Sequence, residues 1–183
     1  MHRREFLLSA TGIVGASTVG SIAYTSATVE RDVTSSVAAD ASAIIGLVDG
    51  GVGAVSKTNG KLQINTDASS SGLNVDSTFW YGDDSSPTST YAFKISNNSD
   101  SSETITLALT DGSSSAMNLP TNAVFNIHVH TSSSNKVGTA SPGSSLDIPL
   151  DASGETTDEA YAVIEIQTPT SNSDITGAMK FTA

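Results

Sequence analysis

The stretches Tyr91-Ala92-Phe93-Lys94-Ile95-Ser96 and Thr104-Ile105-Thr106-Leu107-Ala108-Leu109 decide the fold of this chain, because larger apolar side chains recur at every second position in both. A period of two places successive side chains on opposite faces of a β-strand. Each stretch is therefore predicted to be a strand with one buried and one solvated face. The polar residues 97–102 between them predict either a hairpin turn or a corner at which the chain crosses between sheets.

The rest of the chain repeats this pattern in short segments separated by clusters of Ser, Gly, Asp and Pro. A helical period is absent apart from one helical turn predicted around residues 40–45. Short strands separated by turn-forming clusters are typical of an antiparallel sandwich. The further predicted strands are residues 61–66, 123–131, 145–150, 160–167 and 178–182.

Composition excludes several classes of site. The 183 residues contain no cysteine, so disulfides, zinc ribbons, iron–sulfur clusters and thiol nucleophiles are excluded. A net charge of -11 repels polyanions, which argues against nucleic acid as a partner. Serine is abundant, but no Gly-x-Ser-x-Gly motif accompanies it, so we expect neither an enzyme nor a cofactor.

The N-terminus carries the pattern of an export signal. Residues 1–8, Met-His-Arg-Arg-Glu-Phe-Leu-Leu, place an arginine pair ahead of a mildly apolar segment. This predicts a twin-arginine signal peptide over residues 1–27, with cleavage after Ala23 or Ala27. The alternative, a buried amphipathic helix, is disfavoured by three glycines in the segment. We expect an extracellular or cell-surface protein with no later membrane-spanning segment.

Removal of residues 1–27 increases the negative charge. Arg3, Arg4 and Glu5 leave with the signal, so six basic and eighteen acidic residues remain, a net charge of -12. At molar salt such a surface is screened and stays hydrated, which is typical of a halophilic protein. An ordinary acidic secreted protein is the alternative.

The first segment after the signal, Thr28 to Val37, is predicted to be a strand with a free end. Val29, Val33 and Val37 lie on one face with Arg31 and a serine between them. Such a strand either closes its own sheet or pairs with another copy, because an unpaired edge is a template for association.

Several segments together resemble a known group of secreted proteins. They are Thr28-Val29-Glu30-Arg31-Asp32-Val33, Ala43-Ile44-Ile45-Gly46-Leu47, Asn59-Gly60-Lys61-Leu62, Gly72-Leu73-Asn74 and Phe93-Lys94-Ile95-Ser96-Asn97. The chain resembles secreted proteins of halophilic archaea that are similar to archaeal bundling pilins and, more remotely, to the TasA and camelysin biofilm fibre proteins. The resemblance implies a jelly-roll-like sandwich over residues 28–183 whose N-terminal strand, residues 28–37, is donated to the next subunit of a filament.

Three local patterns indicate candidate sites. His128 and His130 share one face of a strand, a spacing that metal sites use, although exposed strand histidines are also ordinary. The aromatic run 79–81 predicts either a carbohydrate-binding platform or a sandwich edge with Trp80 buried. Asn97 lies in an Asn-x-Ser sequon and is a candidate glycosylation site.

Two functional hypotheses follow. The first is a structural subunit of a pilus or biofilm-matrix fibre, a homopolymer assembled by donor-strand complementation through Val29, Arg31, Val33 and Val37. The second is a secreted monomeric module that binds carbohydrate or metal through residues 79–81 or the histidine pair.

Overall fold

The protein is all-β in the part of the chain that the structure describes. The computed structural model describes residues 28–32, 44–58, 61–65, 73–113, 115–171 and 173–183, and these contain strands and turns but no helix. Accordingly, no helix there is long and apolar enough to cross a membrane. The strands are β1 (Thr28–Asp32), β2 (Ile45–Asp49), β3 (Val55–Thr58), β4 (Lys61–Ile64), β5 (Thr78–Tyr81), β6 (Phe93–Asn97), β7 (Glu103–Thr110), β8 (Val124–Ser132), β9 (Asn135–Ala140), β10 (Ser145–Leu150), β11 (Glu159–Gln167) and β12 (Ala178–Thr182).

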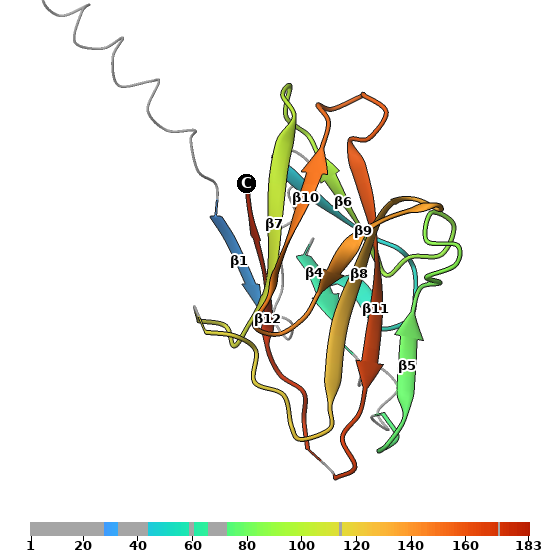
Figure 1. Cartoon of the computed structure of the whole chain (residues 1–183), viewed down its shortest axis with the longest axis vertical. Coiled ribbons are helices and arrows are strands. Elements are labelled where there is room, and N and C mark those ends of the chain that lie inside the picture. Colours follow the sequence, from blue (N-terminus) through green and yellow to red (C-terminus); the bar gives the residue numbers. More distant parts are fainter. Residues whose placement is uncertain (1–27, 33–43, 59–60, 66–72, 114, 172) are drawn as a thin grey trace, which may run out of the picture.

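Two antiparallel sheets make up the body of the molecule (Figure 1). The four-stranded sheet has the order β1-β12-β7-β10. The six-stranded sheet has the order β2-β6-β11-β8-β9, and β5 pairs with the half of β11 that β6 leaves free. A small hairpin, β3-β4, completes the fold.

Alternating side chains of the two sheets form one core. In β7, Ile105, Leu107 and Leu109 are buried, and Thr106 and Ala108 between them are half-buried. Across the core, Phe93 of β6 meets Phe181 of β12 edge to face, with ring centroids 6.3 Å apart. This contact joins the two sheets, and it is a favourable aromatic geometry.

The structure confirms the antiparallel sandwich and most predicted strands. Residues 97–102 form a corner between sheets, because β6 and β7 lie in different sheets. The helical turn predicted around residues 40–45 is wrong at its described end, where Ile45 begins β2 and is buried against the core. The jelly-roll arrangement of the strands stays a prediction. The predicted signal peptide, residues 1–27, lies outside the described residues.

Candidate functional site

The predicted donor strand is the outer strand of the four-stranded sheet. The prediction covered residues 28–37, whereas β1 covers Thr28–Asp32, and Val33 and Val37 lie outside the described residues. Within this chain β1 pairs antiparallel with β12, the C-terminal strand. The register sets Val29 opposite Phe181 and Arg31 opposite Met179.

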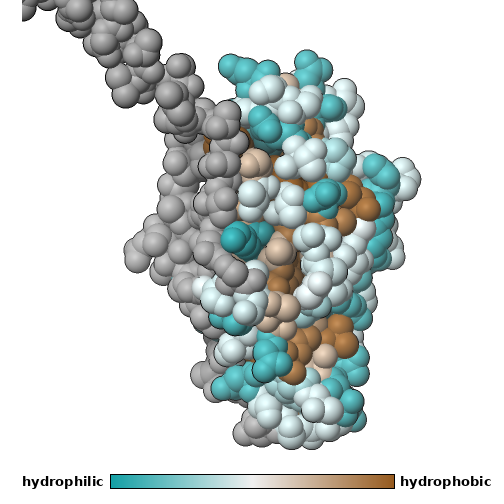
Figure 2. Space-filling model, turned by 60° about the vertical axis from the view of Figure 1, so that its left-hand side comes forward, coloured by the Kyte–Doolittle hydropathy of each residue, from teal (hydrophilic) through white to brown (hydrophobic). Residues whose placement is uncertain are grey.

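The partner strand β12 provides a surface that a strand can complete. Met179 and Phe181 are buried in the core, and Lys180 between them is half-buried. On one side β12 pairs with β7, and on the other with β1 (Figure 1). Figure 2 shows hydrophobic residues at the surface between polar ones. Because β1 is the outer strand of its sheet and pairs with β12, the β1–β12 edge is the first candidate site.

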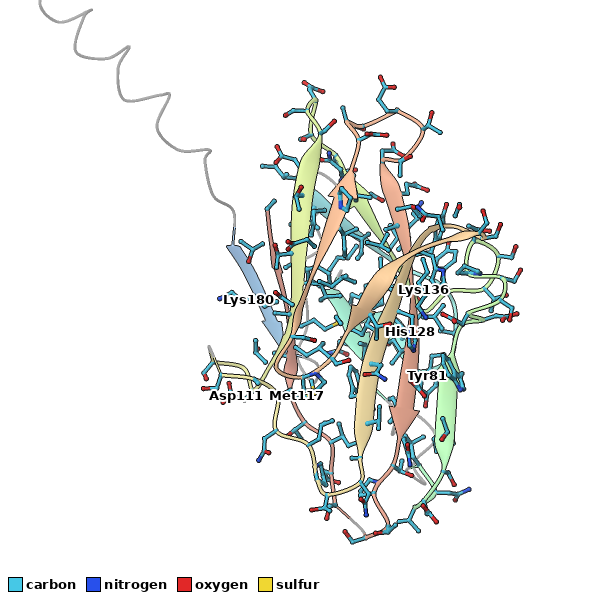
Figure 3. All side chains as sticks on the ribbon, in the orientation of Figure 1. Tyr81, Asp111, Met117, His128, Lys136 and Lys180 are labelled. Atoms are coloured by element: carbon cyan, nitrogen blue, oxygen red, sulfur yellow. The ribbon has the colours of Figure 1, made fainter. Side chains whose placement is uncertain are left out.

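A second candidate site lies on the outer face of the six-stranded sheet. Figure 3 shows Lys180 on one side of the molecule and His128 and Lys136 on the opposite side. The two sites therefore do not overlap.

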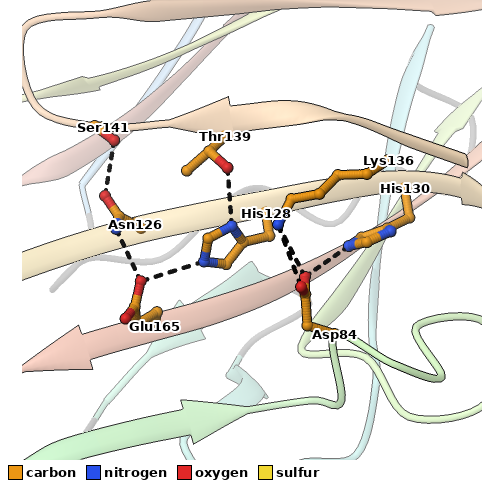
Figure 4. A network of polar contacts seen from close by, with 8 residues as sticks. All are labelled: Asp84, Asn126, His128, His130, Lys136, Thr139, Ser141 and Glu165. Atoms are coloured by element: carbon orange, nitrogen blue, oxygen red, sulfur yellow. Dashed lines mark hydrogen bonds and ion pairs between the residues drawn. The ribbon is translucent and has the colours of Figure 1, made fainter.

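The second site contains a continuous line of hydrogen bonds from β9 across β8 to β11 (Figure 4). Ser141 Oγ donates to Asn126 Oδ1 at 2.7 Å, and Asn126 Nδ2 donates to Glu165 Oε2 at 2.9 Å. His128 Nε2 lies 3.3 Å from the same Glu165 oxygen, and His128 Nδ1 lies 2.8 Å from Thr139 Oγ1. The register explains this line, since Glu165 is opposite Asn126 and His128 is opposite Thr139.

The surroundings of His128 favour its neutral form. Burial lowers the pKa of this imidazole, and the charge of Lys136 acts in the same direction, while the hydrogen bond to Glu165 opposes them. A carboxylate only accepts, so the proton lies on Nε2 and is donated to Glu165, while Nδ1 accepts from the Thr139 hydroxyl.

The line of hydroxyl, imidazole and carboxylate has the composition of a nucleophilic triad. In such a triad the carboxylate stabilises an imidazolium, whereas burial lowers the pKa of His128 and opposes that charge. Thr139 also lies within a regular strand, half-buried. We therefore interpret the line as a scaffold that fixes the orientation of the ring and the carboxylate.

His130 has a separate partner from the loop between β5 and β6. His130 Nε2 lies 2.8 Å from Asp84 Oδ1, and Lys136 Nζ lies 3.2 Å from the same oxygen. Partial burial would raise the pKa of Asp84, but hydrogen bonds from His130 and Lys136 outweigh it and hold that pKa below its usual value. Asp84 thereby ties its loop to the β8–β9 hairpin.

The two histidines have separate carboxylate partners. The two side chains belong to one strand, but each pairs with a different carboxylate. Among the described residues, no group of three His, Asp or Glu side chains is placed to hold a metal ion. The alternative of ordinary exposed histidines is wrong, since His128 and His130 are 8% and 3% exposed.

Trp80 corrects the sequence prediction of a buried tryptophan. It is 47% exposed and stacks on His128, with centroids 5.3 Å apart and planes 18° from parallel. The register with β11 gives the reason: Trp80 is opposite Glu165 on the outer face, while Phe79 and Tyr81 are opposite the buried Ile166 and Ile164.

Asn97 is an internal structural residue. It is 1% exposed, its Nδ2 donates to the carbonyl oxygens of Ser101 and Asp151 at 2.8 and 2.7 Å, and its Oδ1 accepts from the Ser99 backbone N–H. Glycosylation requires that same nitrogen to be accessible. The folded structure therefore contradicts the prediction of a glycosylation site at Asn97.

Sequence reasoning placed Trp80 and His128 in two separate candidate sites, and the structure brings them into contact. It also missed the carboxylates that hold the histidines, Glu165 and Asp84, because they are 37 and 46 residues away in the chain. Comparison of the chain with known protein families, with curated proteins and with solved structures gives no match.

Proposed function

We propose that this protein is a structural subunit of an extracellular filament, a pilus or a biofilm-matrix fibre, assembled by exchange of the strand β1. The observation that carries the proposal is the position of β1. Among the described residues it is the first strand, it lies at the outer edge of its sheet, and its only strand partner is β12.

A neighbouring copy can satisfy the same pairing. The register of β1 on β12 comprises five residue pairs, and the β1 of a second copy presents the same backbone groups. Exchange of an identical element between copies is an inexpensive route to assembly, because the contacts made are those already present in one chain. When each copy donates β1 to the next and the series does not close, an open fibre results.

Pairing of β1 with β12 of its own chain protects the edge of β12 before assembly. A β12 edge without a partner would expose a row of N–H and C=O groups and invite uncontrolled association. The chain's own β1 covers that edge until a neighbour's β1 replaces it. The absence of cysteine fits this route, since the fibre is held by backbone hydrogen bonds and apolar side chains alone.

Truncation tests the proposal. The chain beginning at Thr28 should form large particles by light scattering in concentrated salt and fibres in electron micrographs. The chain beginning at residue 38 has no strand to donate and should form no fibres, and a synthetic peptide of residues 28–37 should bind it one to one and raise its Tm. Fibres from the truncated chain would contradict the donor assignment.

A monomeric binding module is the competing function, favoured by the exposed Trp80. The two differ in size in solution. A monodisperse monomer at high protein concentration, with β1 present, would favour the module.

A further inference from the structure

We propose that the outer face of the six-stranded sheet carries a binding site for uncharged glycans, centred on Trp80 and Glu165. The site lies on the sheet that does not contain β1, so it is independent of the filament proposal. We call Trp80, His128, Glu165 and Gln167 the platform.

The aromatic part of the platform is exposed and fixed. Stacking on His128 covers part of one indole face, and the 47% exposure leaves Trp80 accessible to a ligand. His128 cannot turn freely, because Thr139 and Glu165 bind its two nitrogens. A flat indole fixed before binding suits the C–H-bearing face of a pyranose ring, because little side-chain entropy is lost on stacking.

The polar part of the platform lies beside the indole. Glu165 is directly opposite Trp80, and its Oε2 accepts from both Asn126 and His128. Among the described residues no hydrogen bond reaches its other oxygen, Oε1. Gln167 follows two residues later on the same face of β11. A carboxylate oxygen and an amide beside an aromatic face match the hydroxyl groups around a stacked sugar.

Charge selects among glycans. Glu165 lies within the platform, and the chain without residues 1–27 has a net charge of -12, so uronic-acid and sulfated polymers are repelled at low salt. The expected ligands are therefore neutral hexopyranose glycans.

Fluorescence reports on this site directly, because Trp80 is the only tryptophan in the chain. The protein beginning at Thr28 is titrated with maltohexaose, cellohexaose and mannohexaose, and with oligogalacturonate as the anionic comparison. We expect a saturable change in emission with at least one neutral hexaose and none with the anionic oligomer. Glu165→Gln should raise the half-saturating concentration about tenfold, the loss of one charged hydrogen bond.

Affinity electrophoresis in gels containing the corresponding neutral polysaccharide extends the test to Trp80→Ala, which should lose its retardation. Val48→Ser is the matched control, since Val48 is an exposed apolar residue of β2 and lies outside the platform, and it should be retarded like the unaltered protein.

The proposal would be overturned by no response to any neutral hexaose, by unchanged retardation of Trp80→Ala, or by binding of the anionic oligomer alone. An emission change that accompanies fibre formation without sugar would also overturn it, by assigning the platform to a contact between subunits. That last result would leave the filament proposal intact.

Discussion

Both ring nitrogens of His128 have partners, and burial lowers the pKa of the ring, which favours its neutral form. A lowered pKa in the folded state means that the unfolded chain binds a proton at a pH at which the folded chain does not. The contribution of His128 to stability is therefore fully present above the ordinary histidine pKa of about 6.5 and is lost as the pH falls below it.

Urea unfolding at pH 7 and pH 5 measures this effect. We expect the free energy of unfolding to fall on acidification and expect His128→Gln to reduce the slope in this range, because glutamine has no proton to gain. Equal slopes for the variant and the unaltered protein would show that His128 does not titrate as the structure requires.

Asp84 is the hydrogen-bond partner of the buried His130, whereas Lys136 forms an ion pair with the partly exposed Asp84. Asp84→Ala leaves the Nε2 of the 3% exposed His130 without its acceptor, which should cost about 1–2 kcal/mol. Lys136→Met removes only a surface ion pair and should cost less than about 1 kcal/mol. Urea unfolding of both variants provides the comparison, and equal losses would contradict the role assigned to Asp84.

At the residue scale the sequence predicted some of the second site and could not predict the rest. A period of two correctly placed His128 and His130 on one face of β8. Their partners come from β9, β11 and the β5–β6 loop, and only the register between strands brings these together. Nothing local in the sequence encodes that register.

At the element scale, the strands that alternate clearly were predictable and the others were not. β7, β10 and β12 alternate and pair as neighbours in one sheet. In contrast, β5 has the run Thr-Phe-Trp-Tyr, with no polar residue between its rings, and β9 is largely polar. These two strands are fixed by pairing with β11 and β8, which overrides their weak local pattern.

Gly50, which follows β2, lies where two strands approach one another closely. Gly50 N donates to the Ala92 carbonyl oxygen at 3.0 Å, and a Cβ at Gly50 would overlap the carbonyl oxygen of Tyr91. We expect Gly50→Ala to destabilise the fold by about 1–3 kcal/mol through overpacking against rigid backbone.

Gly53→Ala is the control, because a Cβ there meets nothing within 4 Å. It should change stability by no more than about 1 kcal/mol, in the stabilising direction. Differential scanning calorimetry measures the Tm of both variants. An unchanged Tm for Gly50→Ala would mean that the end of β2 does not approach Tyr91 this closely.

At the scale of the whole molecule, charge opposes folding in dilute buffer. The chain without residues 1–27 has a net charge of -12, and the self-repulsion of these carboxylates is screened within about 3 Å at 1 M salt. We expect Tm to rise by roughly 5 °C or more between 0.2 M and 3 M KCl. Sucrose at matched osmolality should not reproduce the rise, and an unchanged Tm in KCl would contradict the halophilic interpretation.

Strand exchange between copies is the central claim, and disulfide trapping in this cysteine-free chain tests it most directly. The register sets Glu30 opposite Lys180, a separation suited to a disulfide. Glu30→Cys protein and Lys180→Cys protein are mixed, assembled in concentrated salt, oxidised and separated on a non-reducing gel. Strand exchange predicts a covalent dimer whose mass shows one copy of each variant. Absence of that mixed dimer, while the double variant closes its disulfide within one chain, would contradict it.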